Sequence, residues 1–242
     1  MTRTAGELLA DTTGGLAPEP GANPLLPLIE RGAARRGTLA VLALEQREVI
    51  DADLRAFRHL AERSAAREVP AGPECAAFFG LLAEGEAVAR DRLGAYAAGC
   101  GVAPRPPAGR GPRAREAAYE PLAGCQAYPA YVAWLALNGS PAEVVLALCA
   151  NFAAWGGYCA TIAGALRRHY GFDAESCGFF DFFAEPSPEL DRRALAAVQA
   201  ALDAGTLDED AEDRAHRHGR LLATYESGFW RTLWELDRQP AS

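Results

Sequence analysis

The order of apolar and polar positions along the chain predicts a series of long amphipathic helices. Between residues 38 and 65, apolar side chains recur every three or four positions, which is the spacing of one helix face. The same spacing runs through residues 72–101 and 122–139, and a final helix is expected from about Asp210 to Leu236. No segment alternates strictly, as a half-buried strand would. The pattern therefore predicts an all-α, single-domain bundle.

Composition marks the boundaries of this domain. Residues 1–23 are rich in Gly, Pro and Thr, which predicts a flexible N-terminal arm ahead of a helical domain over residues 24–242. Residues 102–113 are rich in Pro, Gly and Arg and indicate a connection, and residues 171–188 are interpreted as a short aromatic segment between helices.

Residues 147–166 are the most unusual stretch, because "ALCANFAAWGGYCATIAGAL" is almost wholly apolar yet contains an asparagine, two cysteines and two polar aromatic residues. Ser140 with Glu143 three residues later is typical of a helix N-terminus just before it. At about 100° per residue, Asn151 and Trp155 share one face of this helix. The helix is either a plain core element or the wall of a pocket, and the pattern alone permits both.

A second signal lies near the C-terminus, in "ATYESGFWRTLW". Leu222, Tyr225, Glu226, Phe229 and Leu233 share one helix face, so a carboxylate stands within an aromatic stripe. Such a glutamate either reaches solvent past the aromatic rings or is buried with a raised pKa. In the second case it is a candidate acid–base group.

Charge and cysteine content narrow the class of protein. The formal net charge is −8, which argues against a nucleic-acid partner. All cationic side chains except histidine are arginines, so lysine-based Schiff-base chemistry is excluded. The six cysteines contain no CxxC pair, no secretory signal is found, and no uninterrupted apolar run reaches the roughly 18 residues of a membrane span. We expect a cytoplasmic protein with reduced thiols and no membrane partner.

The histidines do not suggest a metal site. The chain has four, and His216 and His218 are about 200° apart on a helix, so they cannot face one ion together. We therefore expect neither a metal nor another cofactor.

Three stretches, in this order, resemble the thiaminase II (TenA-like) family: "GTLAVLALEQREVIDADLRAF", "NGSPAEVVLALCANFAAWGGY" and "YESGFW". The resemblance implies the all-α, haem-oxygenase-like fold. It also implies hydrolysis of thiamin or of an aminopyrimidine derived from it. In that family a carboxylate grips the pyrimidine, aromatic rings enclose it, a cysteine attacks and a C-terminal glutamate moves protons.

The resemblance implies a catalytic role for Glu226 as the proton-shuttling glutamate and for Asp51 as the carboxylate that grips the ring. It also places Asn151 where the family has its nucleophilic cysteine. Cys149 and Cys159 do not replace that cysteine, because Cys149 is on nearly the opposite side of the helix and Cys159 is about 12 Å further along its axis. The expected substrate-binding residues are Tyr128, Asn151, Trp155, Phe183, Tyr225 and Phe229.

Asparagine cannot form a covalent intermediate, so three readings stay open. The first is hydrolysis of a small heteroaromatic compound by carboxylate acid–base chemistry. The second is a cofactor-independent natural-product enzyme that oxidises or rearranges its substrate on the same fold, and the third is a non-catalytic binding or regulatory protein. The resemblance also implies a homodimer or homotetramer.

Overall fold

The computed structural model describes residues 3–19, 21–66, 69–103 and 119–240, and over these ranges the chain forms helices and no strand. The helices are α1 (Ala5–Gly15), α2 (Leu26–Glu30), α3 (Arg36–Ser64), α4 (Gly72–Gly99), α5 (Ala123–Asn138), α6 (Pro141–Ala165), α7 (Ala174–Ala184), α8 (Pro188–Asp203) and α9 (Glu209–Arg238). A π-helical turn, Leu166–Tyr170, extends α6. The predicted all-α class is confirmed.

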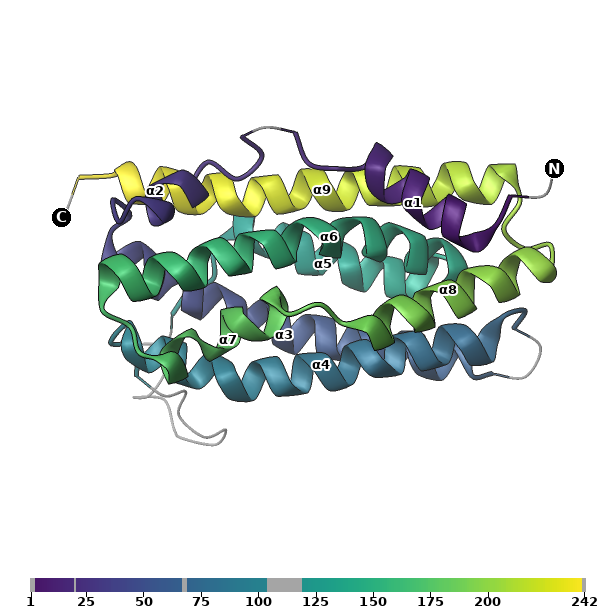
Figure 1. Cartoon of the computed structure of the whole chain (residues 1–242), viewed down its shortest axis with the longest axis horizontal. Coiled ribbons are helices and arrows are strands. Elements are labelled where there is room, and N and C mark those ends of the chain that lie inside the picture. Colours follow the sequence, from purple (N-terminus) through teal and green to yellow (C-terminus); the bar gives the residue numbers. More distant parts are fainter. Residues whose placement is uncertain (1–2, 20, 67–68, 104–118, 241–242) are drawn as a thin grey trace.

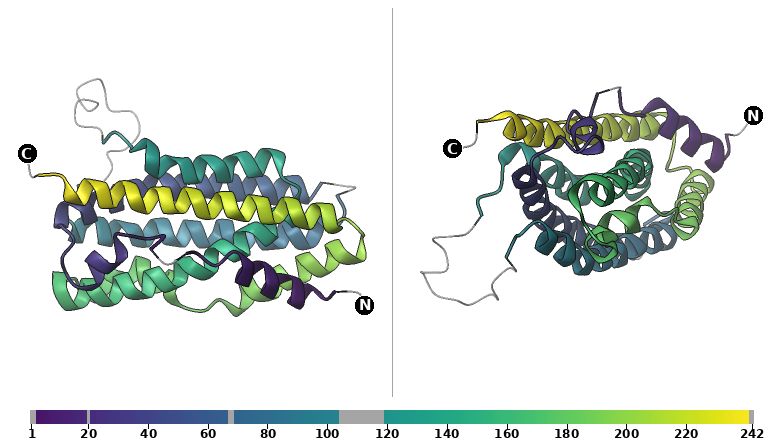
Figure 2. Two further views of the ribbon diagram at one scale, coloured as in Figure 1. Left: turned by 90° about the horizontal axis from the view of Figure 1, so that it is seen from above. Right: turned by 60° about the vertical axis from the view of Figure 1, so that its left-hand side comes forward.

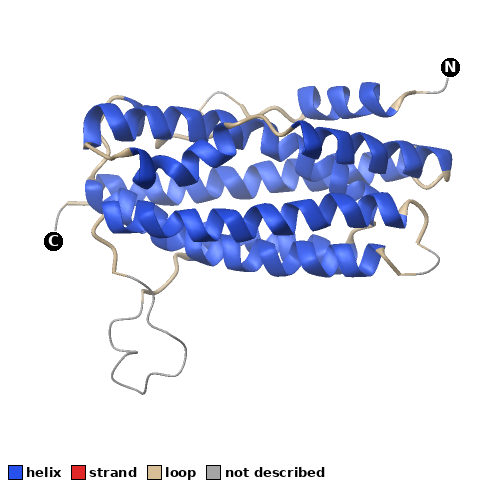
Figure 3. Ribbon diagram, turned by 60° about the horizontal axis from the view of Figure 1, so that its bottom comes forward, coloured by secondary structure: helices blue, strands red, loops and turns tan. Residues whose placement is uncertain are grey.

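The long helices α3, α4, α5, α6 and α9 run along the long axis of the molecule (Figure 1). α3 packs along α4, and α9 packs against both α5 and α6. α7 and α8 follow one another along α4, while α1 and α2 lie outside α6 (Figure 2). Most connections gather at the two ends of the bundle (Figure 3).

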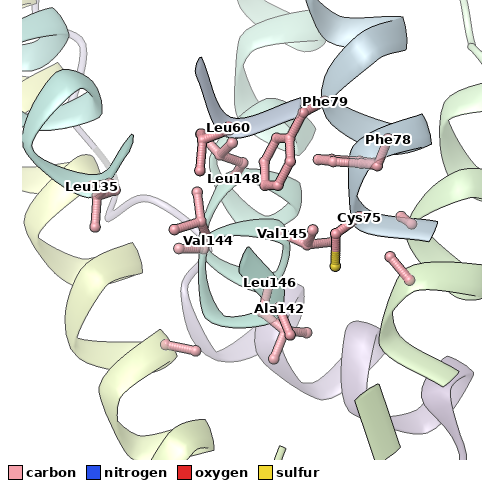
Figure 4. Close-up of a cluster of buried hydrophobic side chains, with 14 of the residues drawn as sticks. Leu60, Cys75, Phe78, Phe79, Leu135, Ala142, Val144, Val145, Leu146 and Leu148 are labelled. Carbon is pink, nitrogen blue, oxygen red and sulfur yellow. The ribbon is translucent and has the colours of Figure 1, made fainter. Parts of the chain in front are cut away.

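Two apolar clusters form the core. The first, here called the Phe78 cluster, is built around Phe78, Phe79 and Val144 and draws side chains from α3, α4, α5 and α6 (Figure 4). The second, the Trp230 cluster, is built around Trp230 and Phe180. Each of the five long helices contributes residues to both clusters. The helices are therefore anchored at two places along their length.

α6 is the most apolar of these helices. Within the described residues, the stretch Pro141–Tyr170 is long and apolar enough to span a membrane by length and composition, which the sequence reading did not anticipate. In the bundle, however, it contacts α1, α2, α4, α7, α8 and α9. This is the environment of a core helix in a soluble bundle.

The start of α6 differs in detail from the expected capping box. Ser140 is the N-cap residue, but its side chain makes no capping hydrogen bond. Glu143 is buried instead and accepts a hydrogen bond from Arg214 Nε at 2.9 Å. Its carboxylate therefore joins α6 to α9.

The N-terminal segment differs from the expected flexible arm. Ala5–Gly15 is a helix that packs on α6 and α8, and Leu8 is fully buried. Thr4 and Glu7 form a capping box, with the Glu7 N–H donating to Thr4 Oγ1 at 3.2 Å. The composition of the first 23 residues obscured this T-x-x-E helix start.

The aromatic segment is also a helix rather than an irregular link. Asp173 caps α7 by accepting a hydrogen bond from the Ser176 N–H at 2.8 Å. Phe179 and Phe180, which belong to this helix, are fully buried. The predicted connection at residues 102–113 falls outside the described residues from position 104 onward.

Two glycines of α4 give opposite expectations for substitution. A Cβ at Gly72 would lie 2.3 Å from the Ser64 carbonyl oxygen, whereas a Cβ at Gly80 would meet nothing within 4 Å. Gly72→Ala is expected to destabilise the protein by about 1–3 kcal/mol, because the α3–α4 turn must open. Gly80→Ala, the matched control, is expected to stabilise it by up to about 1 kcal/mol. Urea unfolding measures both, and equal effects would contradict the packing of this turn.

Candidate functional site

A cavity of about 1360 Å³ lies inside the bundle. It is larger than the roughly 300–1,000 Å³ of ordinary small-molecule pockets. Its lining comes from α1 and from α3 through α9, and much of the wall is apolar. The aromatic part of the wall consists of Tyr128, Phe152, Trp155, Phe182, Phe183, Phe229 and Trp230.

The polar groups of the cavity stand between the two core clusters. On α3, for example, Ile50 belongs to the Trp230 cluster and Leu54 to the Phe78 cluster, and Asp53 lies between them. Each of the other long helices likewise passes from one cluster to the other once along its length. The polar residues at these five positions are Asp53, Glu86, Tyr128, Asn151 and Glu226, and all of them line the cavity.

Four of the lining residues form a continuous hydrogen-bonded chain. The Tyr128 hydroxyl donates to Asn151 Oδ1 at 2.9 Å, and Asn151 Nδ2 donates to Glu226 Oε2 at 2.7 Å. The indole N–H of Trp230 donates to the other carboxyl oxygen of Glu226 at 3.4 Å. Both oxygens of Glu226 are therefore held by fixed donors from α6 and α9.

Helix periodicity explains how the sequence positions this chain. Asn151 and Trp155 are one turn apart on α6 and face the cavity together. Glu226 and Trp230 have the same spacing on α9, so the indole bonds the carboxyl one turn before it. Trp155 lies 6.1 Å from the Trp230 ring centroid and 5.6 Å from that of Phe183.

The Glu226 carboxyl titrates near neutrality. Burial raises its pKa to about 7, while the hydrogen bonds from Trp230 and Asn151 act in the opposite direction. A carboxyl with such a pKa can both accept and donate a proton close to neutral pH.

Asp53 and Glu86 form a second acidic group in the cavity wall. Burial raises the pKa of Asp53 to about 8. Burial, and then the charge of Asp53, hold the pKa of Glu86 well above its ordinary value. Asp53 is 4% exposed, and its Oδ1 has no hydrogen-bond partner among the described residues.

Most of the residues expected at the site do meet in this cavity: Tyr128, Asn151, Trp155, Phe183, Glu226 and Phe229. Two do not. Asp51 is partly exposed and is not in the cavity wall, which Asp53 reaches instead, because two residues turn a helix by about 200°. Tyr225 also lies outside the wall, with its ring 5.1 Å from Tyr131. The acidic residue of α3 that lines the cavity is thus Asp53, two residues after the expected Asp51.

Two acidic residues of the cavity wall were not identified from the sequence: Asp53, which is buried, and Glu86, which is partly buried. Gln46, Ile50, Asp53 and Phe57 follow the three-to-four-residue period of the buried face of α3, so periodicity could have identified Asp53. Glu86 carries no comparable signal, because the apolar stripe of α4 is broad and its neighbours are small.

The cysteines near the cavity are not activated nucleophiles. Cys149 lines the cavity, and burial raises the pKa of its thiol to about 12. Cys159 is fully buried, with a pKa well above the ordinary value because of burial and the nearby Glu226. A thiol reacts through its thiolate, so neither side chain replaces the absent nucleophile at position 151.

The donor set does not fit a haem or a di-metal centre. None of the four histidines lines the cavity. His216 Nε2 lies 3.1 Å from Thr12 Oγ1, and His218 Nδ1 lies 2.9 Å from the Tyr131 hydroxyl. Among the described residues, no group of three His, Cys, Asp or Glu side chains has metal-binding geometry.

Comparisons with known proteins identify the fold. No protein-family model and no curated protein match the chain. A solved structure from Shewanella denitrificans OS217, described as a domain of unknown function with a haem-oxygenase-like fold, superposes with a TM-score of 0.64. The alignment covers 96% of this chain and 95% of that one, at 14% identity. The chain therefore has the haem-oxygenase-like fold, and the comparison carries no activity with it.

The raised pKa values predict how stability depends on pH. The folded protein keeps protons on Asp53 and Glu226 that the unfolded chain releases above about pH 4. The free energy of unfolding is therefore expected to fall between pH 5 and about pH 7, by on the order of 1 kcal/mol per pH unit for each group, and to level off above the raised pKa values. Urea unfolding at several pH values measures this slope.

A variant separates the contribution of Glu226. Glu226→Gln is expected to reduce the slope, because it removes one of the titrating groups. Glu185→Gln, at an exposed position of the same cavity rim, should leave the slope unchanged. A flat profile for the wild type would show that these carboxyls are ionised in the fold.

Proposed function

We propose that this protein is an enzyme that binds a small heteroaromatic molecule in the cavity and hydrolyses it by carboxylate acid–base chemistry. The observation that carries the proposal is the position of Glu226. It faces a largely apolar cavity, both its oxygens have fixed donors, and its pKa is raised to about 7. Perturbed carboxyls in enclosed pockets are characteristic of acid–base sites.

The walls support a planar ring as the ligand. Trp155 stands edge-on to Phe183, and Tyr128 presents a hydroxyl beside the same space. Aromatic rings bind other rings by stacking or edge contacts. This set of walls agrees with the resemblance to the TenA-like family, in which an aminopyrimidine is enclosed by aromatic residues.

The proposed reaction needs no nucleophilic side chain. Glu226 takes a proton from water as the water oxygen bonds to the carbon that bears the leaving nitrogen. The carbon–nitrogen bond breaks, and the proton passes from Glu226 to the departing nitrogen. Asn151 fixes the carboxyl orientation during both transfers through its 2.7 Å hydrogen bond. Such general acid–base assistance typically contributes about 10²–10⁴-fold.

A second candidate rests on the size of the cavity. Its volume of about 1360 Å³ exceeds what one aminopyrimidine fills. This favours a larger natural product, which the protein would rearrange or oxidise without a cofactor, or bind without reaction. The two candidates share the site and differ in the ligand.

The catalytic role of Glu226 is tested by steady-state assays with thiamin and an aminopyrimidine. The wild type is expected to hydrolyse the aminopyrimidine and to act poorly on thiamin, because it lacks a covalent route. Glu226→Gln should lower kcat by about 10²–10⁴-fold. Tyr225→Phe, the adjacent residue outside the cavity, should leave kcat unchanged. Rapid thiamin hydrolysis that is lost in Cys159→Ser would refute the proposal.

The role of Asn151 is tested in the same assays by measuring how kcat depends on pH. Its hydrogen bond lowers the pKa of Glu226, so Asn151→Ala should move the rising limb of the kcat profile to higher pH. A merely structural role would reduce activity without moving the limb.

We also propose that the chain forms a homodimer or homotetramer. Trp134 and Leu137 on α5 are 47% and 67% exposed, and α5 carries no charged residue. Light scattering is expected to show an oligomer that Leu137→Glu dissociates and that Ala196→Glu, an exposed position on α8, preserves. A wild-type monomer at micromolar concentration would contradict this expectation.

A further inference from the structure

The charged side chains that line the cavity are all acidic. Among the described residues of the lining there is no arginine and no histidine, and the whole chain has no lysine. The six acidic residues of the lining are Asp53, Glu84, Glu86, Glu185, Asp191 and Glu226. A cavity lined by one sign of charge concentrates ligands of the opposite sign.

These six residues fall into two groups. Glu84, Glu185 and Asp191 are exposed side chains of α4, of the link between α7 and α8, and of α8. They form an acidic rim. Asp53, Glu86 and Glu226 belong to the interior group between the two core clusters. An approaching cation is therefore attracted first at the rim, and the interior carboxyls attract it when they release their protons.

Asp53 is the interior residue whose bonding is incomplete. It is 4% exposed, it lines the cavity, and no donor among the described residues reaches its Oδ1. A buried acceptor without a donor costs free energy. Glu86 lines the same cavity, and burial and the charge of Asp53 raise the pKa of its carboxyl. When both carboxyls are ionised they have only acceptor atoms. In that state the pair lacks hydrogen-bond donors, which a ligand can supply.

We propose that the Asp53–Glu86 pair binds the protonated amino group of a bulky, largely apolar amine, whose hydrocarbon or aromatic body fills the rest of the cavity. An ammonium supplies three N–H donors and one positive charge, which matches two adjacent carboxyls. The volume of about 1360 Å³ and the aromatic walls accommodate the body. This inference rests on the proposed function in its second form, with a larger ligand, and names the class of that ligand.

Binding of such a cation is coupled to protons. With the pKa of Asp53 raised to about 8, the empty pair holds a proton on Asp53 at neutral pH, and the pKa of Glu86 is raised by burial and by the charge of Asp53. An ammonium favours the ionised pair, so binding expels a proton to solvent. The affinity for the amine therefore rises from pH 6 to pH 8, while the amine itself stays charged. Burial raises the pKa of Tyr128 of α5, which lies close enough to the pair for the charges of Asp53 and Glu86 to raise it further. The other titratable groups of the cavity lining are Cys149 of α6 and Glu226 of α9, with Glu84, Glu185 and Asp191 at the rim.

Isothermal titration calorimetry with three matched probes tests the pair directly. The probes are 4-phenylbutylamine, the neutral 4-phenylbutanol and the anionic 4-phenylbutyrate. At pH 8 the amine is expected to bind at least 10-fold more tightly than the alcohol, and the anion to bind least. The ratio of amine to alcohol affinity should fall at pH 6. Titrations in two buffers of different ionisation enthalpy should show net proton release for the amine alone.

Substitutions assign the preference to the pair. Asp53→Asn and Glu86→Gln should each reduce the preference for the amine over the alcohol to less than 3-fold. Glu84→Gln, two residues earlier on α4 at the rim, should retain most of it. Thermal unfolding checks that each variant folds. If a variant does not fold, the proton release and the pH dependence of amine binding by the wild type test the inference instead.

Two results would overturn the inference. One is equal binding of amine and alcohol by the wild type, and the other is a preference that survives Asp53→Asn combined with Glu86→Gln. Because the probes are not hydrolysed, this outcome is independent of the activity assays. Absence of the preference in an active hydrolase would refute the amine site alone, and its presence without hydrolysis would refute the hydrolytic proposal alone.

Discussion

The hydrogen-bonded chain from Tyr128 through Asn151 and Glu226 to Trp230 makes a buried acid possible in the middle of an otherwise apolar bundle. A carboxyl that leaves water must find donors or keep its proton. Here Asn151 and Trp230 supply the donors at 2.7 and 3.4 Å, and burial still raises the pKa of Glu226 to about 7. Because the donors come from α6 and α9, the chain also fixes how these two helices face each other. The chemistry of the site therefore depends on the packing of the fold.

That packing leaves the middle of the bundle open. The Phe78 cluster and the Trp230 cluster fix each long helix at two places, so the segment between them need not be filled by side chains. Tyr128 packs against both clusters and marks the boundary. Polar residues that would destabilise either cluster are tolerated at this boundary, where they face the cavity. The arrangement separates the two apolar clusters, which stabilise the fold, from the cavity between them, where we propose that the ligand binds.

The sequence predicted those features that helix periodicity controls. The shared face of Asn151 and Trp155 and the place of Glu226 within an aromatic stripe follow from spacing alone, and the all-α class follows from the absence of alternation. Spacing left open whether Glu226 reaches solvent or faces the interior, and the structure places it in the cavity wall. The register on α3 did not follow, because "DAD" offers two carboxylates two residues apart and only the position of the cavity selects Asp53 over Asp51. α1 was missed because its glycines and threonines outweighed a local capping signal. Asp53 and Glu86 line one cavity because α3 packs along α4, and no local pattern encodes that packing.

The raised pKa values of buried groups near the cavity also explain why an asparagine suits position 151. Thiols in this region are held neutral, since the pKa of Cys149 is raised to about 12 and that of Cys159 lies well above its ordinary value. A cysteine at position 151 would face the same burial and the adjacent Glu226, with no cationic residue in the cavity lining to stabilise a thiolate. Asparagine instead donates to Glu226 and accepts from Tyr128, so it satisfies both neighbours without adding charge. In a cavity that gathers carboxyls, the amide of Asn151 is thus the group that keeps the Glu226 carboxyl in place, which is why we propose proton transfer rather than nucleophilic attack for this site.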